Sequence, residues 1–414
     1  MERKNKFLAT PFLTMINMLM LIVISDLHFT DGTASLNVSH RAFSHFFNYL
    51  QRSMRQEYKE LIIVFAGDTF DLLRSNHWMA MDEKEKPWNI NNMEQRTGSE
   101  GGENRWYQKH ITEIFHKTIE ANSKSLEILK QIDGLFSVPI AKIMVLGNHD
   151  RMLREVDHYL HTLSDSMGSV IICDGMYNNQ EYGVTIRHGH EFDSYNYENG
   201  GVPIGDVNTV ELFVRIPFLI KEQCPDLEDE LKSMEDIRPQ WRIFDYLRTT
   251  YTEGRIQSAI KKSLESATDY FLSIPYVQYW IGQHDSYHPF DSADKLQYVL
   301  YLSKILPVHW AEKLLKIFSY FEIQEPHYEN MAEKESSLYV VYGHTHKENI
   351  AFLGLHDSLH RYYINSGTWR ERILASSRGS FTRYKTMTYA LFYKKEERVT
   401  AFPAFELWNG ALRG

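Results

Sequence analysis

Five short motifs rich in metal-binding side chains constrain this chain more than any other feature of its sequence. In chain order they are Asp26-Leu27-His28, Gly67-Asp68-Thr69-Phe70-Asp71, Gly147-Asn148-His149-Asp150, His188-Gly189-His190 and Gly343-His344-Thr345-His346. Four of them directly follow a run of apolar residues that favours a β-strand. One Asp-x-His or His-x-His could arise by chance, but five in this arrangement indicate a fold that gathers them into one site.

The donor atoms that these motifs offer are imidazole nitrogens and carboxylate or amide oxygens, with no cysteine among them. Such donors suit hard or borderline divalent ions, namely manganese, iron, zinc or magnesium, rather than ions that prefer thiolates. A carboxylate that reaches two ions at once would fix the distance between them. The motifs therefore predict one dinuclear metal site.

The five motifs, in this order, resemble the signature of the calcineurin-type metallophosphoesterases: D-x-H, G-D-x-x-D, G-N-H-[DE], one or two histidines after a strand, and G-H-x-H. The resemblance spans roughly residues 19–394. It implies an α/β fold in which two sheets form a sandwich flanked by helices. It also implies a phosphoesterase with two divalent ions, manganese first among them, that clamp a phosphoryl group and activate a bridging water as the nucleophile.

The resemblance also assigns metal ligands. The first ion would be held by Asp26, His28, Asp68 and His346, and the second by Asp68, Asn148, His190 and His344. Asp68 would then bridge the two ions. His188 is one donor too many for these eight contacts, so we expect it to have a supporting or structural role.

The same resemblance makes His149 the general acid and Asp150 the residue that orients it. An unperturbed histidine has a pKa near 6.5, so His149 could donate a proton to the leaving oxygen at working pH. None of these roles requires a covalent intermediate, and the sequence offers no motif typical of a catalytic nucleophile.

Taken one at a time, the motifs also fit structural roles. Asp26 and His28 could form a turn with a hydrogen-bonded histidine, and Asp68 could end its strand in an Asx-turn. The motifs at Asn148 and His344 are harder to explain in this way, because a glycine followed by polar residues is an unusual way to leave a buried strand. Together the five motifs favour one site.

The composition is typical of a compact globular protein: of 414 residues, 43% are hydrophobic and 24% are charged. The only cysteines are Cys173 and Cys224, so we expect no disulfide framework and a reducing, cytoplasmic compartment. The formal net charge of −9 argues against a surface built to grip nucleic acid, although a local basic groove is compatible with that total.

Residues 1–18 imitate a targeting sequence, because basic residues within positions 3–6 precede an uncharged run over 7–25. A membrane span here would pull Asp26 away from the site. We therefore expect residues 19–24 to form the first core strand, with no integral membrane span. The preceding lead-in is expected to be poorly structured, and a misassigned start codon would also explain it.

The remaining pattern alternates helices and strands. Apolar spacing predicts helices over 40–58 and 107–132, and strands over 140–146, 170–173 and 184–187. This order favours parallel strands joined by right-handed crossovers, whose carboxyl ends meet at one edge of a sheet. The stretches 362–364 and 386–393 are expected to supply strands of a second sheet.

Two insertions interrupt a predicted core that comprises residues 19–194 and 336–414. The first, residues 74–106, is polar and rich in glycine and proline, and would either overhang the site or form a solvated loop. Its tryptophans, Trp78, Trp88 and Trp106, favour a loop that packs or binds an apolar group.

The second insertion, residues 195–335, has mostly helical patterning. From Tyr195 to Lys334 there are 14 Lys and Arg against 22 Asp and Glu, a net charge of −8. We interpret it as a helical cap that decides which phosphate compound reaches the ions. The alternative is a lid that only stabilises the fold or forms an oligomer contact; the sequence does not indicate the oligomeric state.

Three branches of the family compete for the substrate. The first two glycine motifs are similar to those of double-strand-break repair nucleases, but an acidic cap argues against DNA. The second insertion, with the stretch 363–369, looks more like the bacterial UDP-diacylglucosamine pyrophosphohydrolases, which differ where His149 stands here. Cyclic-nucleotide and general phosphodiesterases share Gly-Asn-His-Asp. We predict hydrolysis of a small phosphodiester or pyrophosphate.

Two further hypotheses concern binding. Arg370 and Arg372, on either side of Glu371 and next to Trp369, could anchor a substrate phosphate, or could be an exposed charge pair at a strand edge. The protein could also be a metal-binding interaction scaffold without catalysis. Members of that kind typically lack a ligand or the acid histidine, whereas every such position is filled here.

Overall fold

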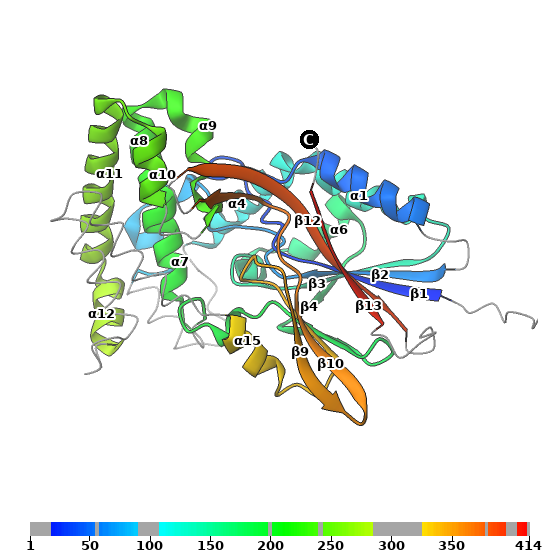
Figure 1. Ribbon diagram of the computed structural model, residues 1–414. Coiled ribbons are helices and arrows are strands. Elements are labelled where there is room, and N and C mark those ends of the chain that lie inside the picture. Colours follow the sequence, from blue (N-terminus) through cyan, green and yellow to red (C-terminus); the bar gives the residue numbers. More distant parts are fainter. Residues whose placement is uncertain are drawn as a thin grey trace, which may run out of the picture.

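The computed structural model describes residues 18–53, 58–89, 107–197, 201–238, 243–284, 325–376, 380–394 and 404–411. Over these ranges two mixed β-sheets form the centre of the molecule, and helices flank them (Figure 1). The predicted α/β sandwich is therefore confirmed. The predicted lead-in falls almost wholly on residues 1–17, which lie outside the described ranges.

The first sheet has the strand order β4-β3-β2-β1-β12-β11-β7, with β13 also paired to β12. Its strands are β1 Met18–Ile24, β2 Tyr58–Ala66, β3 Ile140–Val145, β4 Ile171–Cys173, β7 Ile237–Arg238, β11 Glu371–Ala375, β12 Phe381–Tyr393 and β13 Phe405–Ala411. Strands β1 to β4 run parallel, and β12 lies antiparallel to β1. The stretch 386–393, which we expected in the second sheet, therefore belongs to the first.

The second sheet has the order β5-β6-β8-β10-β9. Its strands are β5 Met176–Asn179, β6 Val184–Arg187, β8 Tyr339–Tyr342, β9 Asn349–His356 and β10 Leu359–Asn365. The central strands β6, β8 and β10 are parallel, whereas β9 and β5 are antiparallel to their neighbours. The predicted strand at 362–364 lies in β10, as expected.

Alternating side chains of the buried strands build two cores. Leu21 and Val23 of β1 point toward the second sheet, where they share a cluster with Val184 and Val341. The intervening residues of β1 face the opposite way, toward the helices. Strands buried on both faces must be apolar throughout, which explains the uninterrupted hydrophobic runs before the motifs.

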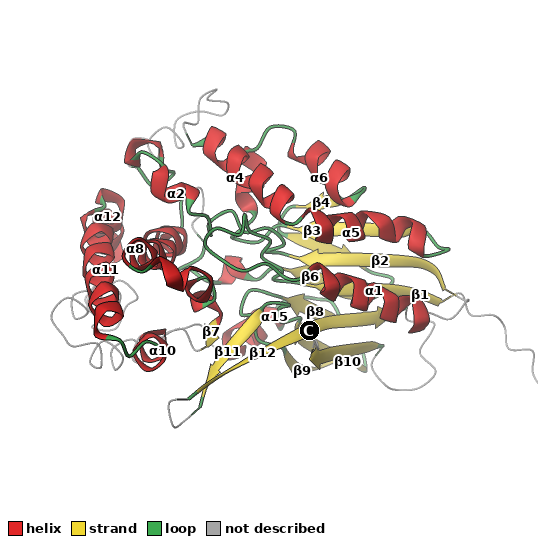
Figure 2. Cartoon of the chain, turned by 90° about the horizontal axis from the view of Figure 1, so that it is seen from above, coloured by secondary structure: helices red, strands yellow, loops and turns green. Residues whose placement is uncertain are grey.

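Helices cover the outer face of each sheet. The first sheet is covered by α1 His40–Ser53, α4 Gln108–Ala121, α5 Ser123–Leu135 and α6 Tyr159–Met167 (Figure 2). The second is covered by α15 Glu325–Ala332, whose Tyr328 packs against Tyr342 and Tyr363. The single helix predicted over 107–132 is two helices that break at Asn122, whose side chain donates a hydrogen bond to Thr30 O at 2.8 Å.

Although α15 falls within the predicted second insertion, it packs on the second sheet. The described part of the insertion over residues 201–284 is mostly helical and lies at one end of the molecule (Figure 1). Its helices are α7 Ile204–Asn208, which continues through a π-helical turn into α8 Arg215–Gln223, then α9 Glu228–Leu231, α10 Ile243–Thr250, α11 Gly254–Ser273 and α12 Pro275–His284. Helix α11 packs along α8, and β7 joins this region to the first sheet. Residues 285–324 of the predicted cap lie outside the described ranges.

The described part of the first insertion packs against the core. It contains the short helix α2 His77–Ala80, and the buried rings of Trp78 and Trp88 lie 5.4 Å apart between centroids. The residues around Trp78 and Trp88 therefore pack against the core, whereas Asp82, Glu83 and Lys84 are exposed. Trp106 lies outside the described residues.

None of the described helices is both long enough and apolar enough to cross a membrane.

Candidate metal centre

The five motifs lie where strands of both sheets end. Strand β2 ends at Ala66, directly before the second motif, and β6 ends at Arg187, directly before His188. Backbone hydrogen bonds then join neighbouring loops within each sheet, His28 N to Asp68 O at 2.8 Å in the first and Gly343 N to His188 O at 3.0 Å in the second. The motifs are thus held together by their own backbones, as expected for the carboxyl edge of parallel strands.

Five polar residues of these loops adopt the left-handed backbone conformation. Their φ angles are +53° for Asp26, +47° for His28, +50° for Asp68, +69° for His344 and +58° for His346. Residues other than glycine rarely adopt this conformation, which costs about 1–2 kcal/mol each. Such strain concentrates at functional sites, where the surrounding structure holds it in place.

The glycines of the motifs allow carboxylates to approach the backbone closely. A Cβ atom on Gly147 would lie 2.2 Å from Asp68 Oδ1, and one on Gly343 would lie 2.5 Å from Asp26 Oδ2. Both distances are well inside van der Waals contact. Gly147 and Gly343 are therefore required by the positions of the carboxylates beside them.

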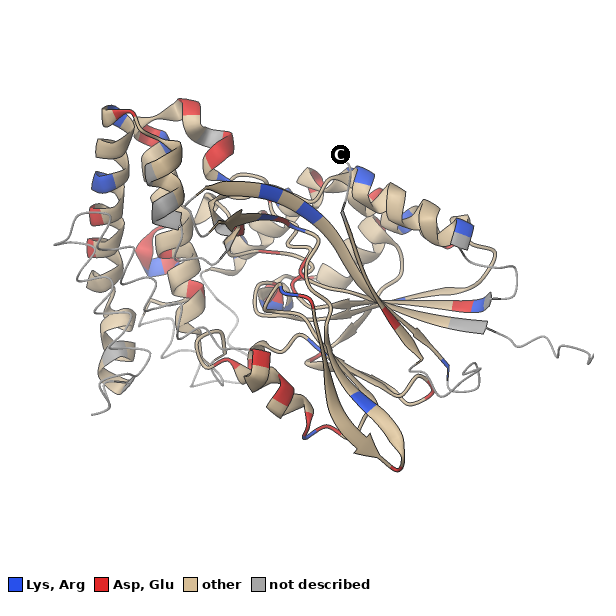
Figure 3. Ribbon diagram, in the orientation of Figure 1, with Lys and Arg blue, Asp and Glu red and all other residues tan. Residues whose placement is uncertain are grey.

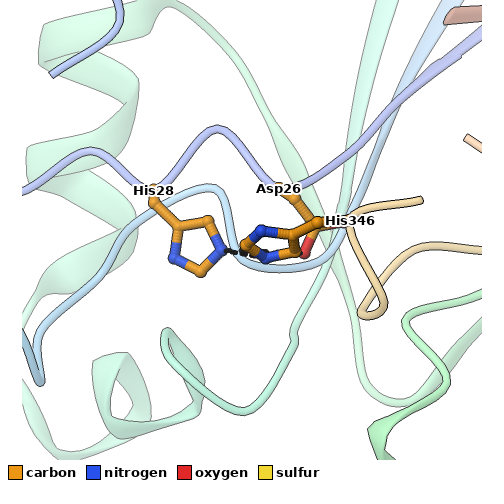
Figure 4. Close-up of side chains that lie close together, drawn as sticks. All are labelled: Asp26, His28 and His346. Atoms are coloured by element: carbon orange, nitrogen blue, oxygen red, sulfur yellow. Dashed lines mark hydrogen bonds and ion pairs between the residues drawn. The ribbon is translucent and has the colours of Figure 1, made fainter. Parts of the chain in front are cut away.

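Asp26, His28 and His346 converge on one point (Figure 4). His28 Nε2 lies 2.9 Å from His346 Nε2, and Asp26 Oδ1 lies 3.2 Å from His346 Nε2 and 3.6 Å from His28 Nε2. Among the described residues, the buried Asp26 Oδ1 accepts no well-formed hydrogen bond. Two imidazole nitrogens and a carboxylate oxygen facing one another in this way fit a divalent cation.

A second group of donors surrounds His188. Its Nε2 lies 3.1 Å from Asp68 Oδ2 and 3.1 Å from Asn148 Oδ1, while Nδ1 faces Ala66 O at 3.0 Å. Asp68 Oδ2 is also 3.7 Å from His28 Nε2 in the first group. Asp68 is thus the carboxylate that lies between the two groups.

His344 completes this side of the site. Its ring packs edge-on against that of His188, with centroids 5.2 Å apart, and its backbone amide donates to Asp26 Oδ2 at 3.1 Å. His344 Nε2 is 3.1 Å from Asp193 Oδ2. Since Asp193 takes Nε2, the nitrogen of His344 left to bind an ion is Nδ1.

His190 takes a different position from the one we expected. Gly189 has φ +103°, which turns the chain so that His190 begins a short 3-10 turn instead of continuing the strand. Its ring lies 5.9 Å from that of Tyr197 and 6.5 Å from that of His344. The structure therefore brings His188, not His190, to Asp68 and Asn148.

His149 lies beside the donors and is oriented by Asp71. His149 Nδ1 is 2.9 Å from Asp71 Oδ1, and the other oxygen of Asp71 is 2.8 Å from His28 Nδ1. Burial alone would lower the pKa of His149, but the charges of Asp71 and Asp68 outweigh it and raise the pKa. His149 is therefore a buried imidazole with a raised pKa that lies beside the donor groups.

Asp150, which we expected to orient His149, instead organises the loops. Its two oxygens accept hydrogen bonds from Gly147 N at 2.6 Å and from Thr69 N at 2.8 Å. Burial and the neighbouring charge of Asp68 raise the pKa of Asp150 to about 7. The carboxylate that faces His149 is Asp71, which belongs to the motif at Asp68.

The carboxylates of the site are fully buried and face imidazoles. Burial alone would raise the pKa of Asp68, but His188 and His149 hold it well below its ordinary value. In return, Asp68 and Asp26 outweigh the effect of burial on His188 and raise its pKa to about 10. The buried carboxylates therefore favour positive charge here, and a divalent cation could supply it in place of protons, which its binding would release.

The two candidate substrate anchors form ion pairs, in which Arg370 is buried and Arg372 is partly buried. Arg370 Nε pairs with Asp236 Oδ1 at 2.8 Å and its Nη2 donates to Ser35 Oγ at 2.7 Å. Arg372 pairs with Glu348 at 2.9 Å and also donates to His346 O at 3.3 Å. Neither arginine is an exposed charge at a strand edge, and Arg372 contacts the site only through the backbone of His346.

Sequence reasoning missed three participants. Asp71 belongs to the motif that begins at Gly67, but the sequence did not show that its side chain faces His149. Asp193 lies three residues after His190 and contacts His344. The spacing of these residues in the sequence does not predict that contact. Arg151, next to Asp150, donates to Asn148 O at 2.6 Å and pairs with Asp206 from the second insertion.

The comparisons with known proteins agree with this geometry. A search of curated proteins finds no match. The family model described as calcineurin-like phosphoesterase matches residues 19–232, just over half of the chain, and thus includes the first four motifs. The fifth motif lies beyond that match, and the fold brings its histidines to the same site. The chain therefore belongs to the calcineurin-like phosphoesterase family, which implies metal-dependent hydrolysis of phosphate esters.

Proposed function

We propose that this protein hydrolyses a phosphodiester or pyrophosphate bond in a small molecule with the help of two divalent ions, manganese being the first choice. The observation that carries the proposal is the position of Asp68, whose Oδ2 lies 3.1 Å from His188 and 3.7 Å from His28. A carboxylate that lies between two groups of nitrogen and oxygen donors is what a dinuclear site requires.

Two sets of residues would hold the ions. The first set is Asp26, His28, Asp68 and His346, and the second is Asp68, Asn148, His188 and His344. The second set replaces His190, our expectation from sequence, by His188, which has the donor geometry described above. When bound, two such ions supply Lewis-acid stabilisation of a phosphoryl group and lower the pKa of a bound water.

Side chains of the protein would donate the proton that the leaving oxygen needs. Asp71 Oδ1 lies 2.9 Å from His149 Nδ1 as an ion pair, which would orient the imidazole so that Nε2 carries the proton to be donated. His149 in this arrangement would protonate the departing oxygen of the substrate. Asp71 also holds His28 at 2.8 Å, so one carboxylate orients both a ligand and the acid.

The choice of a small substrate follows from charge. The stretch from Tyr195 to Lys334 carries a net charge of −8, and Figure 3 shows acidic residues on α9 and α15. Nucleic-acid binding draws much of its affinity from contacts between basic residues and phosphates, which an acidic insertion would oppose. A nuclease is thus the second candidate, and a silent scaffold the third.

The test compares substrates that differ in their leaving group. With manganese, the purified chain should hydrolyse bis-p-nitrophenyl phosphate faster than p-nitrophenyl phosphate, and should also cleave a dinucleotide, whose alkoxide leaving group needs a proton. His149→Ala should lower kcat by about 10²–10⁴-fold on the dinucleotide and less on the nitrophenyl ester. The matched control is His161→Ala, because His161 is exposed and pairs only with the exposed Asp165 among the described contacts.

Three outcomes would change the proposal. Turnover that survives both His149→Ala and Asp68→Ala would end the enzyme interpretation. A strong preference for long single-stranded or duplex DNA would favour the nuclease. Manganese binding without turnover of any phosphate ester would favour the scaffold.

A further inference from the structure

The ligands of the two proposed ions are held in place by different residues. At the first, His28 is held by Asp71, a residue of the metal-binding motifs themselves. At the second, the supports for His344 and Asn148 come from Asp193 and Asp206. Both of these carboxylates lie in the segment 193–208, where the chain leaves the core for the second insertion.

Asp193 holds the imidazole of His344. The carboxylate is buried, and besides His344 Nε2 at 3.1 Å it accepts from Tyr195 N at 2.9 Å and from Asn196 Nδ2 at 2.7 Å. These contacts fix the carboxylate, which in turn fixes the proton of His344 on Nε2. Nδ1 is then an unprotonated donor with a set direction, as in other carboxylate–histidine–metal arrangements.

Asp206 holds Asn148 through an arginine. Asp206 lies on α7, is fully buried, and pairs with both terminal nitrogens of Arg151. Arg151 Nη1 also donates to the backbone oxygen of Asn148 at 2.6 Å. The position of Asn148, whose Oδ1 faces His188 at 3.1 Å, thus depends on a carboxylate of the second insertion.

The two carboxylates belong to one packed unit. Gly205 N, next to Asp206, donates to Tyr195 O at 2.9 Å, two residues after Asp193. A Cβ atom on Gly205 would lie 2.4 Å from Asn196 Oδ1, so the first turn of α7 lies directly against the turn that contains Asp193. A shift of α7 would therefore move both supports together.

We propose that Asp193 and Asp206 are positioning residues for the second ion, so that the root of the second insertion controls occupancy of that ion and not of the first. This inference rests on the dinuclear site proposed above. It makes the insertion a part of the metal centre in addition to any role in admitting substrate.

The experiment measures manganese binding to the purified full chain, by calorimetry and by metal content after gel filtration. Asp193→Asn and Asp206→Asn keep the shape of the side chain, and Asp193→Glu keeps the carboxylate. The control is Asp236→Asn, because Asp236 is an equally buried carboxylate of the insertion that pairs with Arg370 and contacts no proposed ligand side chain.

Wild type and Asp236→Asn are expected to bind two ions per chain. In Asp193→Asn and Asp206→Asn the affinity for one ion should fall by about 10–100-fold, as for other residues that support a metal ligand, while the other ion binds as before. Asp193→Glu should restore part of the loss. Asp193→Asn alone suffices for the test if Asp206→Asn does not fold.

Unchanged binding of both ions in Asp193→Asn would overturn the inference and leave the dinuclear site standing. Equal loss of both ions, or the same loss in Asp236→Asn, would also overturn it, because the effect would then be a general one on the fold. A wild type that binds fewer than two ions would remove the proposed function itself, and this inference with it.

Discussion

Buried carboxylates occur in both the motif loops and the helical insertion, and their partners differ. In the insertion, Asp206, Glu211 and Asp236 pair with Arg151, with Lys86 and Arg215, and with Arg370, respectively. In the motif loops, Asp26 and Asp68 face histidines. A buried carboxylate beside a permanent cation is already neutralised, whereas one beside imidazoles, which can give up their protons, can take a metal ion.

The largest effect is expected from Asp68, because it faces both groups of donors. Asp68→Asn should abolish detectable turnover and manganese binding at both positions, although the side chain keeps its size. Thermal unfolding provides a second measurement. Manganese at 100 times its Kd should stabilise wild type by about 2.7 kcal/mol per ion, and Asp68→Asn should lose that gain. A variant that keeps full manganese-dependent stabilisation would contradict the comparison.

A large effect on catalysis is expected from Asp71, and a different one from Asp150. Asp71→Asn should lower kcat on a dinucleotide by roughly the 10²–10⁴-fold that a general acid contributes, because His149 loses its orienting partner. In Asp150→Asn an amide NH₂ group would face backbone N–H donors that it cannot accept from. We therefore expect this variant to lower the stability of the fold and not kcat. If Asp71→Asn and Asp150→Asn are equally stable and lose kcat equally, Asp150 would orient His149 as the sequence first indicated.

A comparison of His188 with His190 tests which of them is a ligand of the second ion. His188→Ala should remove the second ion from the manganese titration, while His190→Ala should leave two ions bound, because only His188 faces Asp68 and Asn148. The measurement is metal content per chain at a fixed manganese concentration. The reverse pattern would show that the ligand is His190, as the sequence first indicated.

The smallest effect on function is expected in the insertion. Glu211 accepts from Lys86 Nζ at 2.6 Å and from Arg215 Nε at 3.0 Å. Glu211→Gln would leave both cations without this carboxylate. Breaking a buried ion pair of this kind costs about 3–5 kcal/mol, which urea unfolding would measure. Bound manganese and kcat of the folded fraction should stay as in wild type. A loss of metal at unchanged stability would erase the distinction between the two kinds of carboxylate.

The sequence predicts well what depends on local order along the chain. The strands before Asp26, Asp68 and Asn148 are apolar runs, and parallel strands place their carboxyl ends together whatever the loops do. The family and the sandwich follow from these motifs. The strand at 386–393 was also predicted, but its alternation does not reveal which sheet it joins, since either sheet could bury one face of it.

The sequence does not predict what depends on the direction of single side chains. The choice between His188 and His190 is set by the positive φ of Gly189, and the choice between Asp71 and Asp150 by which backbone amides lie nearby. Pairs such as Lys86 and Glu211 join two insertions far apart in the chain, without a local pattern at either residue. Contacts of this kind appear only in the folded structure.

The most direct test of the central claim is a crystal of the manganese-loaded protein measured at the manganese absorption edge. We predict two anomalous peaks about 3.5–4 Å apart, with the carboxylate of Asp68 between them, His28 and His346 at one, and His188 and His344 at the other. A single peak, or two peaks that do not share Asp68, would contradict the account.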